Sequence, residues 1–361
     1  MMRSTPSRAS FALAGAAALV LTACGEAPDE EESNGNGAAA GEDVDYTACV
    51  VSDEGGWNDQ SFNQSAYAGL NEAIDDFGID HAEAESSSES DFVPNVDSMV
   101  QQGCDITFGV GFLLADAIND AALDNEDLTF GLIDEWIPDE PDNGKALVFN
   151  TSEAAYLAGY VAAAMSETGT VGTWGGLQIP SVTVFMDGYA DGVERYNDDN
   201  DDDVSLVGWD KEDQDGSFAG SFDDQNAGRT YTEQLLAQDA DVIMPVAGNA
   251  GVGGAGAIED ADDAKLIWVD SDGYESTDYG DVVLTSVLKD ISQAVYDTIE
   301  EGINDEFTSE PYVGDLANGG VGLAPFHDFE DEVPDEVKDK LEQLREEIVN
   351  GDTVVESENA P

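Results

Sequence analysis

The stretch CVVSDEGGWNDQSFNQSAYAGL (residues 49–70) passes from an apolar run through a glycine-rich bend into a helical pattern. The apolar run extends back to Thr47 and is short enough for a buried strand. After the bend, Phe62, Ala66 and Leu70 recur with the spacing of one helix face. The stretch therefore predicts a strand, a loop and a helix, which are the first parts of a βα unit.

The same alternation continues along the chain. We expect strands at 105–111, 128–134, 145–150, 170–176, 204–209, 241–246 and 265–270, and the apolar run 282–288 leads into a further helix. The helix-period segments are 62–77, 91–104, 113–123, 154–165, 184–196, 229–238, 289–303 and 335–351. Such regular alternation predicts an α/β fold of doubly wound parallel sheets with helices on both faces.

Polar or small residues follow several of these strands. They are Asp53, Asp134, Gly248 and Asp270. A single acid at a strand end is most often a helix cap or a turn residue. Ligands of open parallel sheets, however, bind beyond the carboxyl ends of the strands. Because several strand ends carry such residues, the pattern favours a shared cleft.

The N-terminal 43 residues are unlike the rest of the chain. Residues 1–23 carry two arginines, an apolar core and no acid, which is typical of a secretory signal peptide. The following Cys24 resembles the cysteine of a bacterial lipobox, which implies a lipid anchor on the extracytoplasmic face of the cell membrane. Residues 24–43 read as an acidic flexible linker, so the fold is expected to begin near Val44.

The net charge is −69, and loss of the signal peptide with Arg3 and Arg8 would make it −71. Such a field repels nucleic acid and anionic lipid headgroups, so neither is expected as a partner. The acids are spread over a chain that is 41% apolar, which favours a solvated surface adapted to high salt over a disordered acidic tail. Recruitment of cations by the acidic surface is the competing interpretation.

Two cysteines, Cys49 and Cys104, belong to the expected folded part. They lie at the starts of two strand patterns, where either a disulfide or two buried thiols would fit. The sequence shows no metal-ligand cluster of cysteine and histidine. The acidic runs 197–204 and 210–216 invite a calcium interpretation, but Lys211 and Phe222 would occupy ligand positions of the EF-hand pattern. Solvated loops are the better explanation.

Enzyme motifs have little support. Gly251, Gly253 and Gly256 form a G-x-G-x-x-G pattern after a strand, but it lies deep in the chain, so a tight turn leading into a helix is favoured over a dinucleotide site. No nucleophile–base pair stands out. We therefore expect no catalytic residues, no metal and no cofactor. Several aromatics could instead stack on a planar ligand: Trp57, Phe62, Phe112, Phe185 and Phe222.

Several motifs, taken in order, resemble the basic membrane protein (BMP) family, the substrate-binding lipoproteins of ABC importers that include purine-nucleoside receptors. The matching stretches are SDEGGWNDQSFNQSAYAGL, DSMVQQGCDITFGVGFLLADA, FNTSEAAYLAGYVAAAM, PSVTVFMDGYADGV, GSFDDQNAGR, IWVDSDGYE and LTSVLKDI. The turn PVAGNAGVGG departs from the glycine-dense form of this family. The resemblance implies a type I periplasmic-binding fold, in which two lobes joined by three crossovers close on a ligand. It would place lobe 1 at 44–148 and 283–305, and lobe 2 at 149–282 and 306–350.

The resemblance also implies a set of nucleoside contacts. Phe62 and Phe222 would stack on the base. Asn63 and Asp134 would read its edge, while Asp270 and Lys289 would hold the ribose. The full implied set is Asp53, Phe62, Asn63, Asp134, Phe222, Gly248, Asp270 and Lys289.

The sequence thus predicts a lipid-anchored binding protein, and not an enzyme, that delivers a nucleoside, expected to be a purine nucleoside, to an ABC permease. A binding protein for another small polar ligand such as a sugar is the first alternative. An NAD-dependent oxidoreductase and a surface lipoprotein without a transport role are the others.

Overall fold

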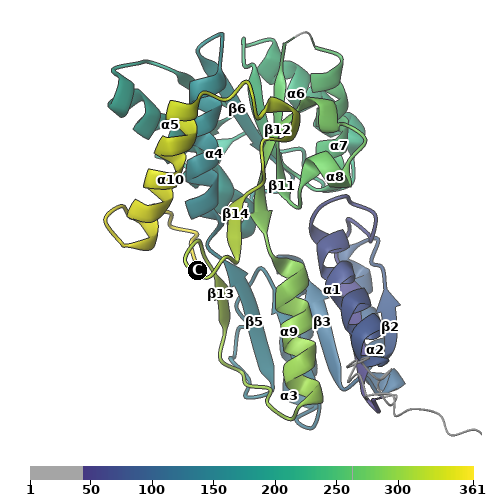
Figure 1. Ribbon diagram of the computed structural model, residues 1–361. Coiled ribbons are helices and arrows are strands. Elements are labelled where there is room, and N and C mark those ends of the chain that lie inside the picture. The colour runs from purple at the N-terminus through teal and green to yellow at the C-terminus, as the bar shows by residue number, and fades with distance from the viewer. Residues whose placement is uncertain (1–43, 262) are drawn as a thin grey trace, which may run out of the picture. The chain divides into compact units, whose positions relative to one another are not determined.

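The computed structural model describes residues 44–261 and 263–361, so the predicted signal peptide, Cys24 and the linker to residue 43 lie outside the described residues. Two six-stranded sheets organise this part of the chain, with helices on both sides of each (Figure 1). The predicted α/β class with a type I periplasmic-binding architecture is confirmed.

The first sheet has the strand order β13-β5-β4-β3-β1-β2, and all its neighbours pair in parallel. Its strands and helices are β1 (Thr47–Ser52), α1 (Phe62–Phe77), β2 (Asp80–Ala84), α2 (Glu89–Gln102), β3 (Ile106–Val110), α3 (Ala115–Asp124), β4 (Thr129–Ile133), β5 (Gly144–Phe149) and β13 (Tyr312–Gly314). Helix α9 (Ile291–Ile303) packs against α1, where Gly69 approaches the Ser292 carbonyl. We call this sheet with its helices the first lobe.

The second sheet has the order β14-β12-β11-β10-β6-β7, and only its edge strand β14 runs antiparallel. This second lobe contains α4 (Thr151–Met165), β6 (Thr170–Gly175), α5 (Pro180–Asn200), β7 (Ser205–Val207), α6 (Gln225–Leu236), β10 (Val242–Val246), α7 (Asn249–Glu259), β11 (Lys265–Asp270), α8 (Gly273–Ser276), β12 (Val283–Lys289), β14 (Val321–Leu323) and α10 (Asp335–Val349). A small hairpin, β8 (Trp209–Asp210) with β9 (Asp215–Gly216), follows β7.

The chain passes between the lobes three times. The passages lie between β5 and α4, between β12 and α9, and between β13 and β14. The sheet memberships differ from the lobe boundaries implied by the sequence at two places. Strand 283–289 pairs in the second sheet rather than the first, and strand 312–314 pairs in the first rather than the second.

Two local expectations also differ from the structure. Strand β2 (DHAEA) was not predicted, because an exposed edge strand has no apolar run to mark it. The glycine-rich segment after β10 is mostly the helix α7. A Cβ on Gly253 would lie 1.9 Å from the Gln225 carbonyl oxygen, so this glycine allows α7 to pack closely on α6. Helix packing thus accounts for part of the G-x-G-x-x-G pattern.

Cys49 and Cys104 form a disulfide, which settles the choice that the sequence left open. Cys49 lies in β1, and Cys104 lies two residues before β3. These strands are hydrogen-bonded neighbours, and the Cα atoms of the two cysteines lie 6.0 Å apart. The disulfide therefore links β1 to the segment that leads into β3.

Candidate functional site

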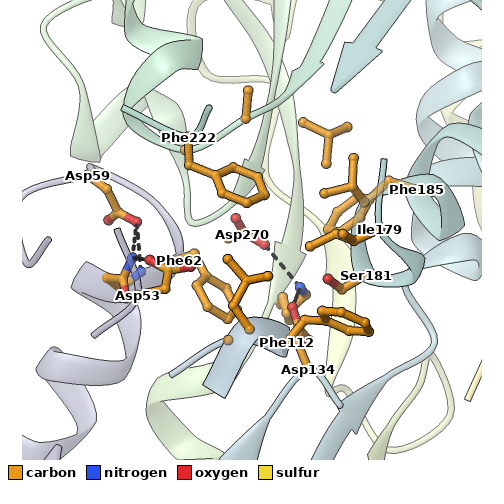
Figure 2. A pocket seen from close by; sticks show the side chains of 18 residues that line it. Asp53, Asp59, Phe62, Phe112, Asp134, Ile179, Ser181, Phe185, Phe222 and Asp270 are labelled. Atoms are coloured by element: carbon orange, nitrogen blue, oxygen red, sulfur yellow. Dashed lines mark hydrogen bonds and ion pairs between the residues drawn. The ribbon is translucent and has the colours of Figure 1, made fainter. Parts of the chain in front are cut away.

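A single cavity at the carboxyl ends of the strands brings the predicted site residues together (Figure 2). Its empty space, counted out to the open mouth, is about 530 Å³. All eight implied contacts line it: Asp53, Phe62, Asn63, Asp134, Phe222, Gly248, Asp270 and Lys289. Both lobes contribute, as the position of the cavity at the strand ends of the two sheets requires.

Two aspartates occupy equivalent places in the two sheets. Asp134 directly follows β4, and Asp270 ends β11. Their φ values are +66° and +68°, a left-handed conformation that is uncommon for residues other than glycine but more accessible to aspartate. The conformation turns each chain sharply at the strand end, which leaves the carboxylate at the cavity (Figure 2).

Lys289 joins these two aspartates across the lobes. It ends β12, and its Nζ lies 2.6 Å from Asp134 Oδ2 and 3.3 Å from Asp270 Oδ1. The ammonium group also lies 5.1 Å from the ring centre of Phe62 and 4.9 Å from that of Phe185. Both aromatic faces favour the charged form of the lysine.

The surroundings of Lys289 shift the titration of the ion pair. Burial lowers the lysine pKa, but the charges of Asp134 and Asp270 outweigh it, so the pKa is raised and the lysine stays charged. For Asp134, burial raises the pKa and outweighs the opposite effect of Lys289. A buried ion pair of this kind requires hydrogen bonds to its remaining lone pairs, which a polar ligand can supply.

A second polar group surrounds the start of α1. Asn63 Nδ2 donates to Asp53 Oδ1 at 2.7 Å and to Asp59 Oδ2 at 3.2 Å. The exposed fractions of Asp53, Asp59 and Asn63 are 7%, 1% and 2%. Burial raises the pKa of Asp53 and of Asp59 to about 6. The hydrogen bonds that each carboxylate accepts lower the pKa, but burial has the larger effect. The carboxylates therefore favour neighbours that donate hydrogen bonds.

Aromatic rings enclose the polar groups. Figure 2 shows Phe62 and Phe222 on either side of the same space, one from each lobe. Phe112 and Phe185 also line the cavity, whereas Trp57 stacks on Tyr67 at a ring-centre distance of 5.2 Å and does not line it. Aromatic side chains on two sides of a cavity are suited to a flat ring.

Gly248 occupies the position before α7. Its φ of +51° and ψ of −132° are accessible to glycine but strained for other residues. The residue lines the cavity where α7 begins. Because it has no side chain, the backbone can approach a ligand closely at this point.

The loop before α1 also binds the second lobe directly. The Gln60 carbonyl oxygen accepts hydrogen bonds from Trp268 Nε1 at 3.1 Å, from Ser271 Oγ at 2.9 Å and from Ser276 Oγ at 3.0 Å. Ser61 Oγ donates to Asp270 Oδ2 at 2.6 Å. These bonds hold the two halves of the cavity together on one side.

The sequence argument missed two polar residues of the cavity, Asp59 and Ser181. Asp59 lies outside the predicted contact set but lines the cavity. Its position two residues before Ser61, the N-cap of α1, explains the capping role. The sequence contains no separate indication of the contact with Asn63, which depends on the fold of the loop.

Within residues 44–261 and 263–361, no group of three or more histidine, cysteine or acidic side chains is arranged to hold a metal ion. In the same part of the chain, none of the helices has the length and apolar character that crossing a bilayer requires.

Two parallel-sheet lobes, three crossings and a cavity at the strand ends of both sheets define a periplasmic-binding fold. Residues 46–359 match the Bmp family, described as "ABC transporter substrate-binding protein PnrA-like". The chain therefore belongs to the Bmp family and is a substrate-binding protein of an ABC transporter. The family consists of extracytoplasmic substrate-binding proteins, not enzymes.

Individual relatives agree with this assignment. The chain is 32% identical to the "ABC transporter nucleoside-binding protein BmpA" of Lactococcus lactis, covering 96% of this chain and 97% of the relative. It is 28% identical to "Basic membrane protein A" of Borreliella burgdorferi, covering 88% and 89%. Among solved structures, an ABC transporter solute-binding protein from Aeropyrum pernix superposes with a TM-score of 0.79 at 26% identity, covering 87% and 94%.

Proposed function

We propose that this protein captures a nucleoside, preferably a purine nucleoside, in the cavity between its lobes and delivers it to an ABC permease. The supporting observation is the composition of the cavity: two opposed phenylalanines, buried carboxylates and one buried cation. The name of the Lactococcus lactis relative, a nucleoside-binding protein, agrees with it.

The flat base is proposed to lie between Phe62 and Phe222. Its edge would meet Asp53 and Asn63, which line the cavity next to Phe62 and offer acceptors to N–H groups. Stacking of this kind supplies affinity without selecting one base, so the choice among bases depends on the polar groups at the edge.

The ribose is proposed to lie against the charged group of Asp134, Asp270 and Lys289. A carboxylate can accept from both hydroxyls of a diol, and the ammonium can donate to their oxygens. The family resemblance implied a base-edge role for Asp134. We assign it instead to the ribose side, because its carboxylate contacts Lys289 Nζ at 2.6 Å.

We also propose that Cys24 carries a lipid anchor on the extracytoplasmic face of the membrane. The signal-like residues 1–23 support this placement. So does the Cys49–Cys104 disulfide, since disulfides persist in oxidising compartments outside the cytoplasm. Incorporation of radiolabelled palmitate into the wild-type chain, and its loss in Cys24→Ser, would test the anchor. Equal labelling of both chains would contradict it.

The ligand is tested by calorimetric titration with inosine, guanosine and adenosine at matched high salt. We expect saturable binding that Asp270→Ala weakens at least about tenfold, since a charged hydrogen-bond partner is lost. Asp272→Ala is the matched control, because Asp272 caps α8 two residues further on and does not line the cavity. Absence of binding to every nucleoside, or saturation with an aldopentose instead, would refute the proposed ligand class.

A further inference from the structure

Asp59 makes more hydrogen bonds than a helix cap needs. Its Oδ1 accepts from the backbone N–H groups of Ser61 at 3.1 Å and Gln64 at 3.0 Å, and its Oδ2 accepts from that of Asn63 at 2.8 Å. Ser61 is the N-cap residue of α1, but its hydroxyl makes no capping bond because it donates to Asp270 and the Val269 carbonyl. The carboxylate of Asp59 therefore replaces the N-cap side chain.

The same carboxylate fixes the side chain of Asn63. The amide NH₂ group of Asn63 has two hydrogens, and its nitrogen lies near Asp53 Oδ1 and Asp59 Oδ2. Turning the amide over would point its oxygen at two carboxylates, which offer only acceptors when ionised. The NH₂ group must therefore face the two aspartates, and the oxygen must point away from them.

The Asn63 oxygen is left without a partner. Asn63 Oδ1 is buried and accepts no hydrogen bond in the described structure, although Asn63 lines the cavity. A buried acceptor without a donor costs about 1–3 kcal/mol, so a ligand that supplies the donor recovers this free energy. A ligand that presents an acceptor at the same point leaves the cost in place.

We propose that Asp59 is a positioning residue of the binding site, which holds the Asn63 amide so that it accepts, and cannot donate, a hydrogen bond from the ligand. The site then selects ligands that present an N–H or O–H donor to Asn63. This inference rests on the proposed function for the identity of the ligand, whereas the positioning of Asn63 is a property of the ligand-free chain.

The positioning is tested without any ligand by NMR of the Asn63 side-chain amide, assigned by its loss in Asn63→Ala. We expect the NH₂ protons to exchange slowly with water in the wild type and at least about tenfold faster in Asp59→Asn. Asp224→Asn is the matched control, since Asp224 caps α6 through the same kind of contact and lies outside the cavity. Unchanged exchange in Asp59→Asn would overturn the inference.

The selection is tested with inosine, which carries N1–H, and adenosine, which has a bare acceptor at N1. We expect about tenfold tighter binding of inosine by the wild type and a ratio within about threefold in Asp59→Asn. A merely structural role would weaken both ligands equally and keep the ratio, which would overturn the inference. In an Asn63→Ala background, Asp59→Asn should no longer change the ratio.

Two further outcomes are distinguishable. If Asp59→Asn does not fold, Asp59→Glu keeps the charge but moves the carboxylate by one methylene, and faster Asn63 amide exchange with an unchanged inosine-to-adenosine ratio in that variant would overturn the inference. If the wild type binds no nucleoside, the proposed function fails, and the amide-exchange measurement still decides whether Asp59 positions Asn63.

Discussion

The two lobes have similar sheets but different internal supports. In the first lobe, the disulfide between Cys49 and Cys104 links β1 to the segment that leads into β3. Among the described residues, the second lobe contains no cysteine, and its helices α4 and α5 pack through glycines, as α1 and α9 of the first lobe do at Gly69. A Cβ on Gly159 would lie 2.1 Å from the Tyr189 carbonyl oxygen, and one on Gly192 would lie 2.0 Å from that of Tyr156.

The lobes also differ in what they bring to the cavity. The first lobe supplies the acceptor group around Asn63, with Asp53 and Asp59. The second supplies Lys289, the only cation among the described residues that line the cavity. The buried acceptors of the cavity thus come from both lobes, whereas its ammonium donor comes from the second lobe.

The largest expected effect comes from removing the support of the first lobe. Replacing both Cys49 and Cys104 by serine should lower the free energy of unfolding by about 4 kcal/mol, because the disulfide closes a loop with a sequence separation of 55 residues. Urea unfolding would measure the loss. Hydrogen exchange should accelerate mainly in β1 and β3, and equal acceleration in the second lobe would contradict the comparison.

The reciprocal change is Gly192→Ala in the second lobe. The added methyl group must push α5 away from α4, so we expect a loss of about 1–3 kcal/mol, the usual cost of overpacking. Gly322→Ala is the control, since a Cβ there would meet no atom within 4 Å. Faster exchange in the first sheet than in α4 and α5 would show that the lobes are not supported independently.

The smallest effect concerns pH and the acceptor group of the first lobe. Because burial raises the pKa of Asp59 to about 6, the folded state holds a proton that the unfolded state releases above about pH 4. The contribution of protonated Asp59 to the stability of the folded state is therefore present below about pH 4 and is lost as the pH rises through about 6. The charge of Asp270 also raises the pKa of Asp59, and the charges of Asp59 and Glu54 raise the pKa of Asp53.

Urea unfolding of the wild type and Asp59→Asn at pH 5 and pH 7 would test this. The wild type should lose roughly 1 kcal/mol relative to the variant between the two values. Nucleoside affinity of the wild type should change in the opposite sense and rise with pH, because the ionised carboxylates accept the ligand's donors. A stability difference independent of pH would show that Asp59 does not titrate with a raised pKa.

Much of the fold follows from local sequence patterns. The helix expected at 62–77 is α1 with the same bounds, and the strand expected at 47–52 is β1. The strand-end residues Asp53, Asp134, Gly248 and Asp270 all reach one cavity, because parallel strands bring their carboxyl ends to the same edge of a sheet. Their roles toward a ligand stay predictions.

Periodicity within short segments was enough to predict the alternation of strands and helices, the class of fold and the residues at the strand ends. Long-range contacts decide which sheet receives strand 283–289, that Cys49 pairs with Cys104, and that the Asn63 amide nitrogen faces Asp53 and Asp59. A strand buried on both faces has the same apolar pattern in either sheet. The orientation of an amide depends on partners that only the folded loop brings within hydrogen-bond distance.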